Sequence, residues 1–353
     1  MGVSMSVKNS KNKYLYLEKA ALIVIIAVAA VLISLVLFTD IFSGNSKKGQ
    51  TVDPSVSDPD NVPSPTYLNK SETAADTGPS ASTSETVEIK KDDTKFVRTT
   101  FSNDLVKSGT LILVNNSYAF NITKEHEKAL INVYKEYGSK NYGYTSGKEA
   151  LLPVAAKALN EMLTAFKSST GLDDVILHYC YVDYETQNRY YNNQVKALGE
   201  ATASVWTKHA GCTEHHTGLA FNLDVSHSGE KVGEGTYKWI TDHCAEYGII
   251  RRFPEDKKNI TYEIDESNHF RYVGVAHAEY IMQNGLCLEE YISLLNDHPY
   301  SDPLLIRTDD GDYYAYYAPA DASAAETGIY VPEDKEYDIS GNNIGGFVIC
   351  YKS

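Results

Sequence analysis

The sequence predicts an α+β domain in which a small antiparallel sheet is flanked by helices. Segments with apolar residues at helical spacing, of which 149–166 is the strongest, alternate along the chain with short β-rich runs such as 175–182 and 218–225. From about residue 299 the composition shifts to Tyr, Asp, Gly and β-branched residues, which are typical of strands and turns. We therefore expect a mixed domain at residues 101–298 and a β-rich extension at residues 299–353.

The elements of both regions follow from periodicity and from turn residues. The helix at 149–166 should stop at Gly171 and a helix at 236–247 at Gly248, because glycine readily adopts the left-handed conformation that closes helices. The Asp310-Gly311 pair indicates a turn between two strands. The tyrosines of the extension are interpreted as strand residues, with stacking on sugar rings as the alternative. The remaining helices are expected at 124–137, 184–199, 275–284 and 288–296, and the remaining strands at 110–114, 304–307, 313–317 and 347–351.

An uncharged apolar run at residues 20–38 precedes the domain. As a helix it would be about 28 Å long, close to the ~30 Å hydrocarbon core of a bilayer. Lysines lie before it and Asp40 follows it, which predicts a membrane anchor with residues 1–19 in the cytoplasm and the domain outside, on the cell wall side. A cleaved signal peptide is the alternative, but no small-x-small cleavage pattern follows the run.

Residues 39–100 connect this anchor to the domain and are rich in Ser, Thr, Asp, Pro and Lys. Such a segment buries too little apolar surface to offset the entropy lost on ordering. We expect a disordered linker whose r.m.s. span is roughly 40 Å, enough to hold a domain away from the membrane.

Charge and cysteine content exclude several classes of protein. The net charge is −15 with no basic patch, which argues against a nucleic-acid partner. The five cysteines are scattered and form no C-x-x-C pair, so a cysteine zinc knuckle is not expected. One or two disulfides remain compatible with an extracytoplasmic domain.

Two segments, 211–224 and 265–274, carry the residues that best suit metal chemistry. The first offers His215 with oxygen donors downstream, and the second offers Glu266 and His269. A catalytic zinc takes three protein ligands and a water, and a carboxylate outside the coordination shell can accept the proton of that water. We expect His215 and His269 to bind Zn²⁺, Glu266 to act as general base, and the adjacent His216 to point elsewhere.

The third ligand is ambiguous. Asn222 offers a neutral amide oxygen, which compensates the charge of a metal less well than a carboxylate does. Asp224 lies two residues further on and would share a strand face with Asn222, so its carboxylate could join the shell directly or through water. The other alternative is a site that holds metal weakly or not at all.

Residues 213–222 (TEHHTGLAFN) resemble the Ser-x-His-x-x-Gly-x-Ala-x-Asp motif of the VanY-type D-alanyl-D-alanine carboxypeptidases. Residues 266–274 (ESNHFRYVG) resemble the family's Glu-x-Trp-His-Phe-Arg-Tyr-Val-Gly motif, and 247–254 (YGIIRRFP) resemble the segment between the two. The resemblance implies a zinc peptidase fold of the LAS/hedgehog type and hydrolysis of the D-Ala-D-Ala bond in a peptidoglycan stem peptide. It also implies roles for His215, Asn222 or Asp224 and His269 as metal ligands, Glu266 as general base, and Gln187 and Thr213 as substrate contacts.

The sequence departs from the family pattern at three positions: Asn222 replaces the aspartate ligand, Val182 replaces an arginine that binds the substrate carboxylate, and Asn268 replaces a tryptophan. Three hypotheses follow. The chain is an anchored zinc carboxypeptidase, a catalytically silent module that binds wall peptides, or a peptidase for a substrate without a free carboxylate. Candidate cations to replace the missing guanidinium are Arg189, Arg252 and Arg271.

Overall fold

The computed structural model describes residues 87–88, 94–226, 229–263 and 267–353. The predicted anchor, nearly all of the predicted linker and Glu266 lie outside these residues. Within the described ranges, no helix combines the length and the apolarity needed to cross a bilayer.

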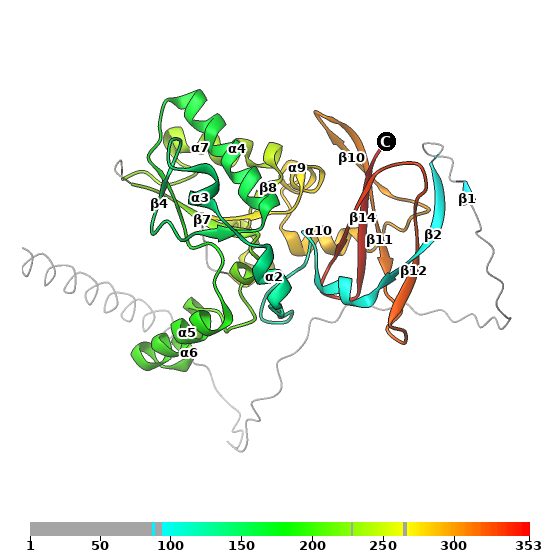
Figure 1. Ribbon diagram of the computed structural model, residues 1–353, viewed down its shortest axis with the longest axis horizontal. Helices are drawn as coiled ribbons and strands as arrows, with labels where there is room; N and C mark the ends of the chain where they lie inside the picture. The colour runs from blue at the N-terminus through cyan, green and yellow to red at the C-terminus, as the bar shows by residue number, and fades with distance from the viewer. Residues whose placement is uncertain (1–86, 89–93, 227–228, 264–266) are drawn as a thin grey trace, which may run out of the picture. The chain divides into compact units, whose positions relative to one another are not determined.

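A five-stranded sheet forms the centre of the mixed domain (Figure 1). Its strands follow the order β4-β6-β7-β9-β8, and only the β4–β6 pair is parallel. This arrangement confirms the predicted α+β class with a small, mainly antiparallel sheet. The strands are β4 (Gly143–Tyr144), β6 (Val175–His178), β7 (Ala220–Val225), β8 (Ile249–Arg251) and β9 (His269–Tyr272).

Helix α4 (Pro153–Thr170) covers one face of this sheet together with α7 (Lys238–His243). Proline opens α4, where its missing N–H costs nothing, and Gly171 closes it in the left-handed conformation, as predicted. The apolar side of α4 packs on alternate strand residues, which include Leu177, Phe221, Leu223 and Phe270. The residues between them, such as Asn222 and His269, therefore face the opposite side of the sheet.

The single helix predicted at 124–137 is wrong, because the chain breaks after α2 (Lys124–Ala129) and restarts at α3 (Val133–Tyr137). Between them, β3 (Ile131–Asn132) pairs with β5 (Ala150–Leu151), and the Asn132 side chain caps α3 by accepting from the Lys135 N–H. The other helices and helical turns are α5 (Tyr184–Leu198), α6 (Glu200–Trp206), α8 (Lys258–Thr261), α9 (Val275–Gln283), α10 (Leu288–Leu295), η1 (Asn103–Lys107), η2 (Glu214–Thr217), η3 (Gly235–Tyr237), η4 (Cys244–Tyr247) and η5 (Glu255–Lys257).

The predicted strand at 110–114 is also wrong, although the segment is buried. Its backbone groups pair outside any sheet. Ser340 Oγ accepts from the Leu111 N–H, and the Arg271 guanidinium donates to the carbonyls of Thr110 and Ile112. Buried apolar residues in an extended segment have the sequence pattern of a strand. Here, however, side chains satisfy several of the backbone polar groups, and the Leu113 N–H donates to the Asn342 carbonyl.

The β-rich extension contains the predicted strands and two more, with one sheet ordered β10-β11-β14-β13. Ordered structure begins before the predicted domain boundary at residue 101. Strand β2 (Lys95–Ser102) lies partly in the predicted linker, buries Phe96 and pairs along its length with β12 (Glu326–Pro332). The remaining strands are β1 (Val87–Glu88), β10 (Leu304–Thr308), β11 (Gly311–Pro319), β13 (Tyr337–Gly341) and β14 (Gly346–Lys352).

The cysteines form no disulfide, although all five lie in the described part of the chain. Four are buried, and burial raises the pKa of Cys244 and Cys350 to about 12, so their thiols stay protonated at neutral pH. The disulfides that the sequence left open are therefore absent from the structure.

Candidate active site

A short loop brings His215 to the polar face of the sheet. Thr213 caps the turn η2 and its hydroxyl accepts from the His215 N–H, while Gly218 ends η2 with a φ of 63°. A Cβ at Gly218 would lie 2.5 Å from the Leu130 side chain, so the chain can turn into β7 at this distance only with glycine. The ring centroids of His215 and His269 are 4.9 Å apart. The prediction that two distant segments bring these imidazoles together is confirmed.

The strand register places the other candidates beside this pair. Asn222 on β7 is paired with His178 on β6 and with His269 on β9, so the three side chains share one face. The face forms the wall of a cavity of about 420 Å³. The lining includes every predicted site residue that the structure describes, namely Gln187, Thr213, His215, Asn222, Asp224 and His269, together with His178, Tyr179, Trp206, Lys208, Phe253, Glu263 and Asn268 among others.

The donor set at this face suits a divalent ion. His215 is buried, and burial and the neighbouring His269 ring hold the pKa of its imidazole well below the ordinary value, which keeps the lone pair that a metal needs. The Asn222 Oδ1 atom is buried and has no hydrogen-bond partner within the described residues. Two imidazoles and this amide oxygen fit a zinc ion, with less charge compensation than a carboxylate would give.

No group of three His, Cys, Asp or Glu side chains is placed to hold a metal in the part of the chain that the structure describes. The second candidate ligand, Asp224, is bound to other residues. Its Oδ2 lies 2.9 Å from His178 Nε2, and its Oδ1 accepts from Asn268 Nδ2 at 2.9 Å. Both oxygens of the second candidate ligand are thus engaged outside the pair of imidazoles.

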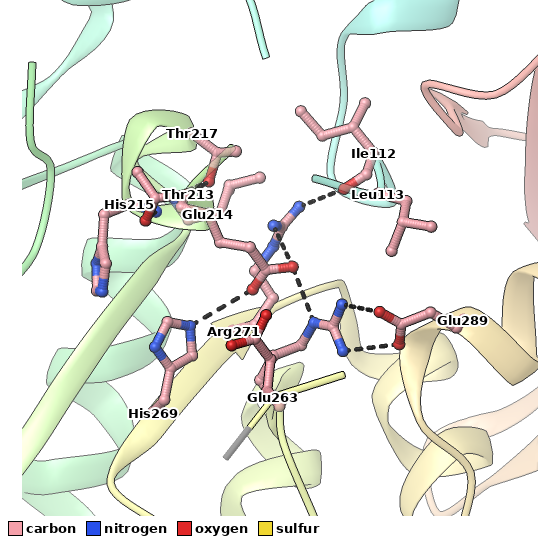
Figure 2. A network of polar contacts seen from close by, with 12 residues as sticks. Ile112, Leu113, Thr213, Glu214, His215, Thr217, Glu263, His269, Arg271 and Glu289 are labelled. Carbon is pink, nitrogen blue, oxygen red and sulfur yellow. Dashed lines mark hydrogen bonds and ion pairs between the residues drawn. The ribbon is translucent and has the colours of Figure 1, made fainter. Parts of the chain in front are cut away.

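Glu214 is a buried member of the site that sequence reasoning missed (Figure 2). Its Oε2 lies 3.5 Å from His269 Nε2, and its Oε1 accepts from Arg252 Nε at 2.8 Å and lies 3.3 Å from Arg271. Arg252 also donates to both oxygens of Glu289, at 2.9 and 2.7 Å. Burial alone would raise the pKa of Glu214, but Arg252 and Arg271 hold it well below the ordinary value.

This charged network has consequences for two further predictions. Arg252 and Arg271 cannot replace the missing substrate arginine, because both are fully buried and bound to Glu214 or to backbone carbonyls. Arg189 is exposed on α5 and does not line the cavity. The cation in the lining is Lys208, which forms an ion pair with Glu263 and which the sequence did not single out.

Two neighbouring residues have structural roles. Both ring nitrogens of His216 bind backbone groups, the Gly211 N–H at 2.9 Å and the Val182 carbonyl at 2.6 Å, which confirms that His216 points away from the candidate metal position. Val182 is itself buried. Its side chain is therefore a packing residue where the family pattern has a guanidinium.

Comparisons with known proteins agree with this fold. The family model "VanY: D-alanyl-D-alanine carboxypeptidase" matches residues 148–275. A D-alanyl-D-alanine carboxypeptidase of Enterococcus faecium is 29% identical over 254 residues, which cover 71% of this chain and 77% of that protein. The bifunctional D-Ala-D-Ala dipeptidase and carboxypeptidase VanXYC of Enterococcus gallinarum is 33% identical over 151 residues, or 40% of this chain and 76% of that protein.

Among solved structures, the D,D-dipeptidase VanXYg, in complex with a D-Ala-D-Ala phosphinate analogue, superposes with a TM-score of 0.63. At 24% identity it covers 73% of this chain and 99% of its own, and it supports the fold. The fold and the paired imidazoles thus place the protein in the class of mixed α+β peptidase-like domains. More specifically, the chain belongs to the VanY family of D-alanyl-D-alanine carboxypeptidases.

Proposed function

We propose that this protein is a zinc-dependent carboxypeptidase that removes the terminal D-alanine from peptidoglycan stem peptides. The observation that carries the proposal is the cavity that His215, His269 and Asn222 line together, with the two imidazole rings 4.9 Å apart. The names of the family and of the relatives suggest the substrate class. We also propose, from sequence alone, that residues 20–38 anchor the chain in the membrane and leave this domain on the cell wall side.

Separate residues of the chain would bind the metal, transfer the proton and bind the substrate. His215, His269 and Asn222 would hold the zinc, which when bound polarises a carbonyl and lowers the pKa of a water molecule. Glu266, three residues before His269 and outside the described residues, would accept the proton of the attacking water and deliver it to the leaving amine. The buried Gln187 donates to the Lys208 carbonyl and keeps its Oε1 without a partner in the described structure, so it can accept from a substrate N–H.

Lys208, whose ammonium forms an ion pair with Glu263, would bind the substrate's terminal carboxylate in place of that partner. It is the one Lys or Arg in the described lining of the cavity, and its side chain is 22% exposed. A carboxypeptidase without the family's guanidinium needs such a cation. An ammonium gives a point charge rather than a bidentate contact, which predicts weaker substrate binding than an arginine would give.

We therefore predict that Lys208→Met raises KM for a D-Ala-D-Ala peptide by about 10-fold or more and changes kcat less, because a hydrogen bond to a charged group contributes about 1.5–3 kcal/mol. Steady-state kinetics would measure this split. Lys157→Met, an exposed lysine on α4 with 66% side-chain exposure, is the matched control and should leave both constants unchanged. Equal KM values for the Lys208 variant and the unmutated protein would exclude this role.

The proposed function is tested by incubating the full chain, purified in detergent, with a muropeptide ending in D-Ala-D-Ala, with and without added zinc. We expect D-alanine to be released, and a chelator to stop the release. Muropeptide binding without D-alanine release at saturating zinc would instead support the catalytically silent wall-binding module. Neither binding nor release would reject both hypotheses.

A further inference from the structure

We infer that Asn222 serves as an oriented amide ligand and that Asn268 and Asp224 are positioning residues that fix which end of this amide faces the metal. The inference deepens the proposed function and rests on it, because it assumes that the cavity binds a divalent ion. It assigns a purpose to two of the three positions at which the sequence departs from the family pattern.

The physical problem is the asymmetry of an amide. A carboxylate has two equivalent oxygens, so either can bind a cation after a half-turn of the side chain. An amide carries one oxygen and one NH₂ group, and the same half-turn would aim two donor hydrogens at the metal. Replacing the aspartate ligand by Asn222 therefore creates a need that the aspartate did not have: the orientation of the side chain must be fixed.

Three side chains meet this need in a directional series. The carboxylate of Asp224 can only accept, so Asn268 must present its NH₂ group to it, at 2.9 Å. The Asn268 Oδ1 then faces the other way and accepts from Asn222 Nδ2 at 3.2 Å. The Asn222 Oδ1 is left as the buried oxygen without a hydrogen-bond partner in the described chain.

The backbone holds the series in place. Asn222 and Asp224 point to the same face of β7, and the Asn268 carbonyl accepts from the Leu223 N–H between them at 3.0 Å. At the far end, His178 Nε2 lies 2.9 Å from Asp224 Oδ2. The charge of Asp224 sets the direction of both amides, because reversing Asn268 would place its oxygen against a carboxylate.

This arrangement also gives Asp224 a role other than ligand. Its side chain is 50% exposed and contacts Asn268 and His178, whereas the Asn222 oxygen is buried. Of the two candidates for the third ligand, the geometry points to Asn222. A hydrophobic side chain at position 268 could neither accept from Asn222 nor donate to Asp224.

The test is a double-mutant cycle on zinc affinity, measured by competition with a chromophoric chelator and independent of catalysis. The four full-length proteins are the unmutated chain, Asn268→Ala, Asn222→Asp and the double variant. We expect Asn268→Ala to weaken zinc binding by about 10-fold or more. Removing a residue that orients a metal ligand typically lowers metal affinity by this amount. In the Asn222→Asp background, which should bind zinc more tightly, the same change should cost less than twofold, because either carboxylate oxygen can ligate.

Asp224→Asn provides a second variant that is close in volume, and it should also weaken zinc binding because an amide at 224 no longer imposes a direction. Thermal unfolding of each zinc-free variant separates a loss of affinity from a loss of fold. Equal losses for Asn268→Ala in both backgrounds, or no loss in either, would overturn the orientation role while leaving the proposed function intact. Absence of zinc from the unmutated protein would overturn the proposed function and this inference together.

Discussion

Changing either His215 or His269 to alanine will abolish stoichiometric zinc binding and D-alanine release. The proposed donor set has only two imidazoles and one neutral amide oxygen, so no carboxylate ligand remains to hold the ion after one imidazole is lost. We expect zinc affinity to fall by at least about 100-fold, more than the loss expected when a residue behind a ligand is removed. Equilibrium dialysis against a zinc buffer would measure the stoichiometry directly.

The matched control for these variants is His243→Ala. His243 lies on α7, on the other side of the sheet, with a 38% exposed side chain that pairs with Glu246. The His243→Ala variant should bind zinc with the same affinity and stoichiometry as the unmutated protein. Retention of one zinc per chain by His269→Ala, with the fold intact, would show that the metal binds elsewhere and would contradict the assignment of this site.

Replacing Arg252 by methionine will destabilise the domain by about 3–5 kcal/mol, because breaking a buried ion pair from one side leaves an uncompensated charge. Arg252 is fully buried and joins Glu214 to Glu289 through three hydrogen bonds. Its loss leaves Arg271 as the guanidinium beside Glu214. Urea unfolding followed by circular dichroism would give the change in the free energy of unfolding.

Two comparisons make this prediction specific. Lys157→Met breaks the exposed pair with Glu161 and should change stability by no more than about 0.5 kcal/mol. Adding Glu289→Gln to Arg252→Met should recover part of the loss, because Glu289 is the carboxylate whose two hydrogen bonds both come from Arg252. A loss below 1 kcal/mol for Arg252→Met, or no coupling between the two changes, would mean that the network contributes little to holding β9 and His269 in place.

Local patterns were enough to predict much of the fold. The β-rich run at 218–225 predicted β7, and glycine after α4 marks where that helix ends. The two motifs predicted that His215 and His269 meet, and they do. The strand β2 escaped prediction because it pairs with residues more than two hundred positions later, next to a polar segment that gave no strand signal.

The parts of the site that were missed depend on contacts between distant segments. Glu214 binds Arg252, and Arg252 in turn binds Glu289. Each of these residues lies more than thirty positions from the one before it, so nothing in the local sequence specifies these partners. The series from Asn222 through Asn268 to Asp224 depends on the register between β7 and the residues before β9. The sequence shows that two family residues are replaced by asparagine, but only the strand pairing shows that the two asparagines contact each other.

X-ray absorption at the zinc edge, on the full chain loaded with one equivalent of zinc, is the most direct test of the proposed centre. We predict two imidazole nitrogens at about 2.0–2.1 Å, with oxygen making up the rest of the shell. Both imidazole contributions should disappear in a protein carrying His215→Ala and His269→Ala together. A spectrum of the unmutated protein without imidazole scattering would contradict the proposed metal centre.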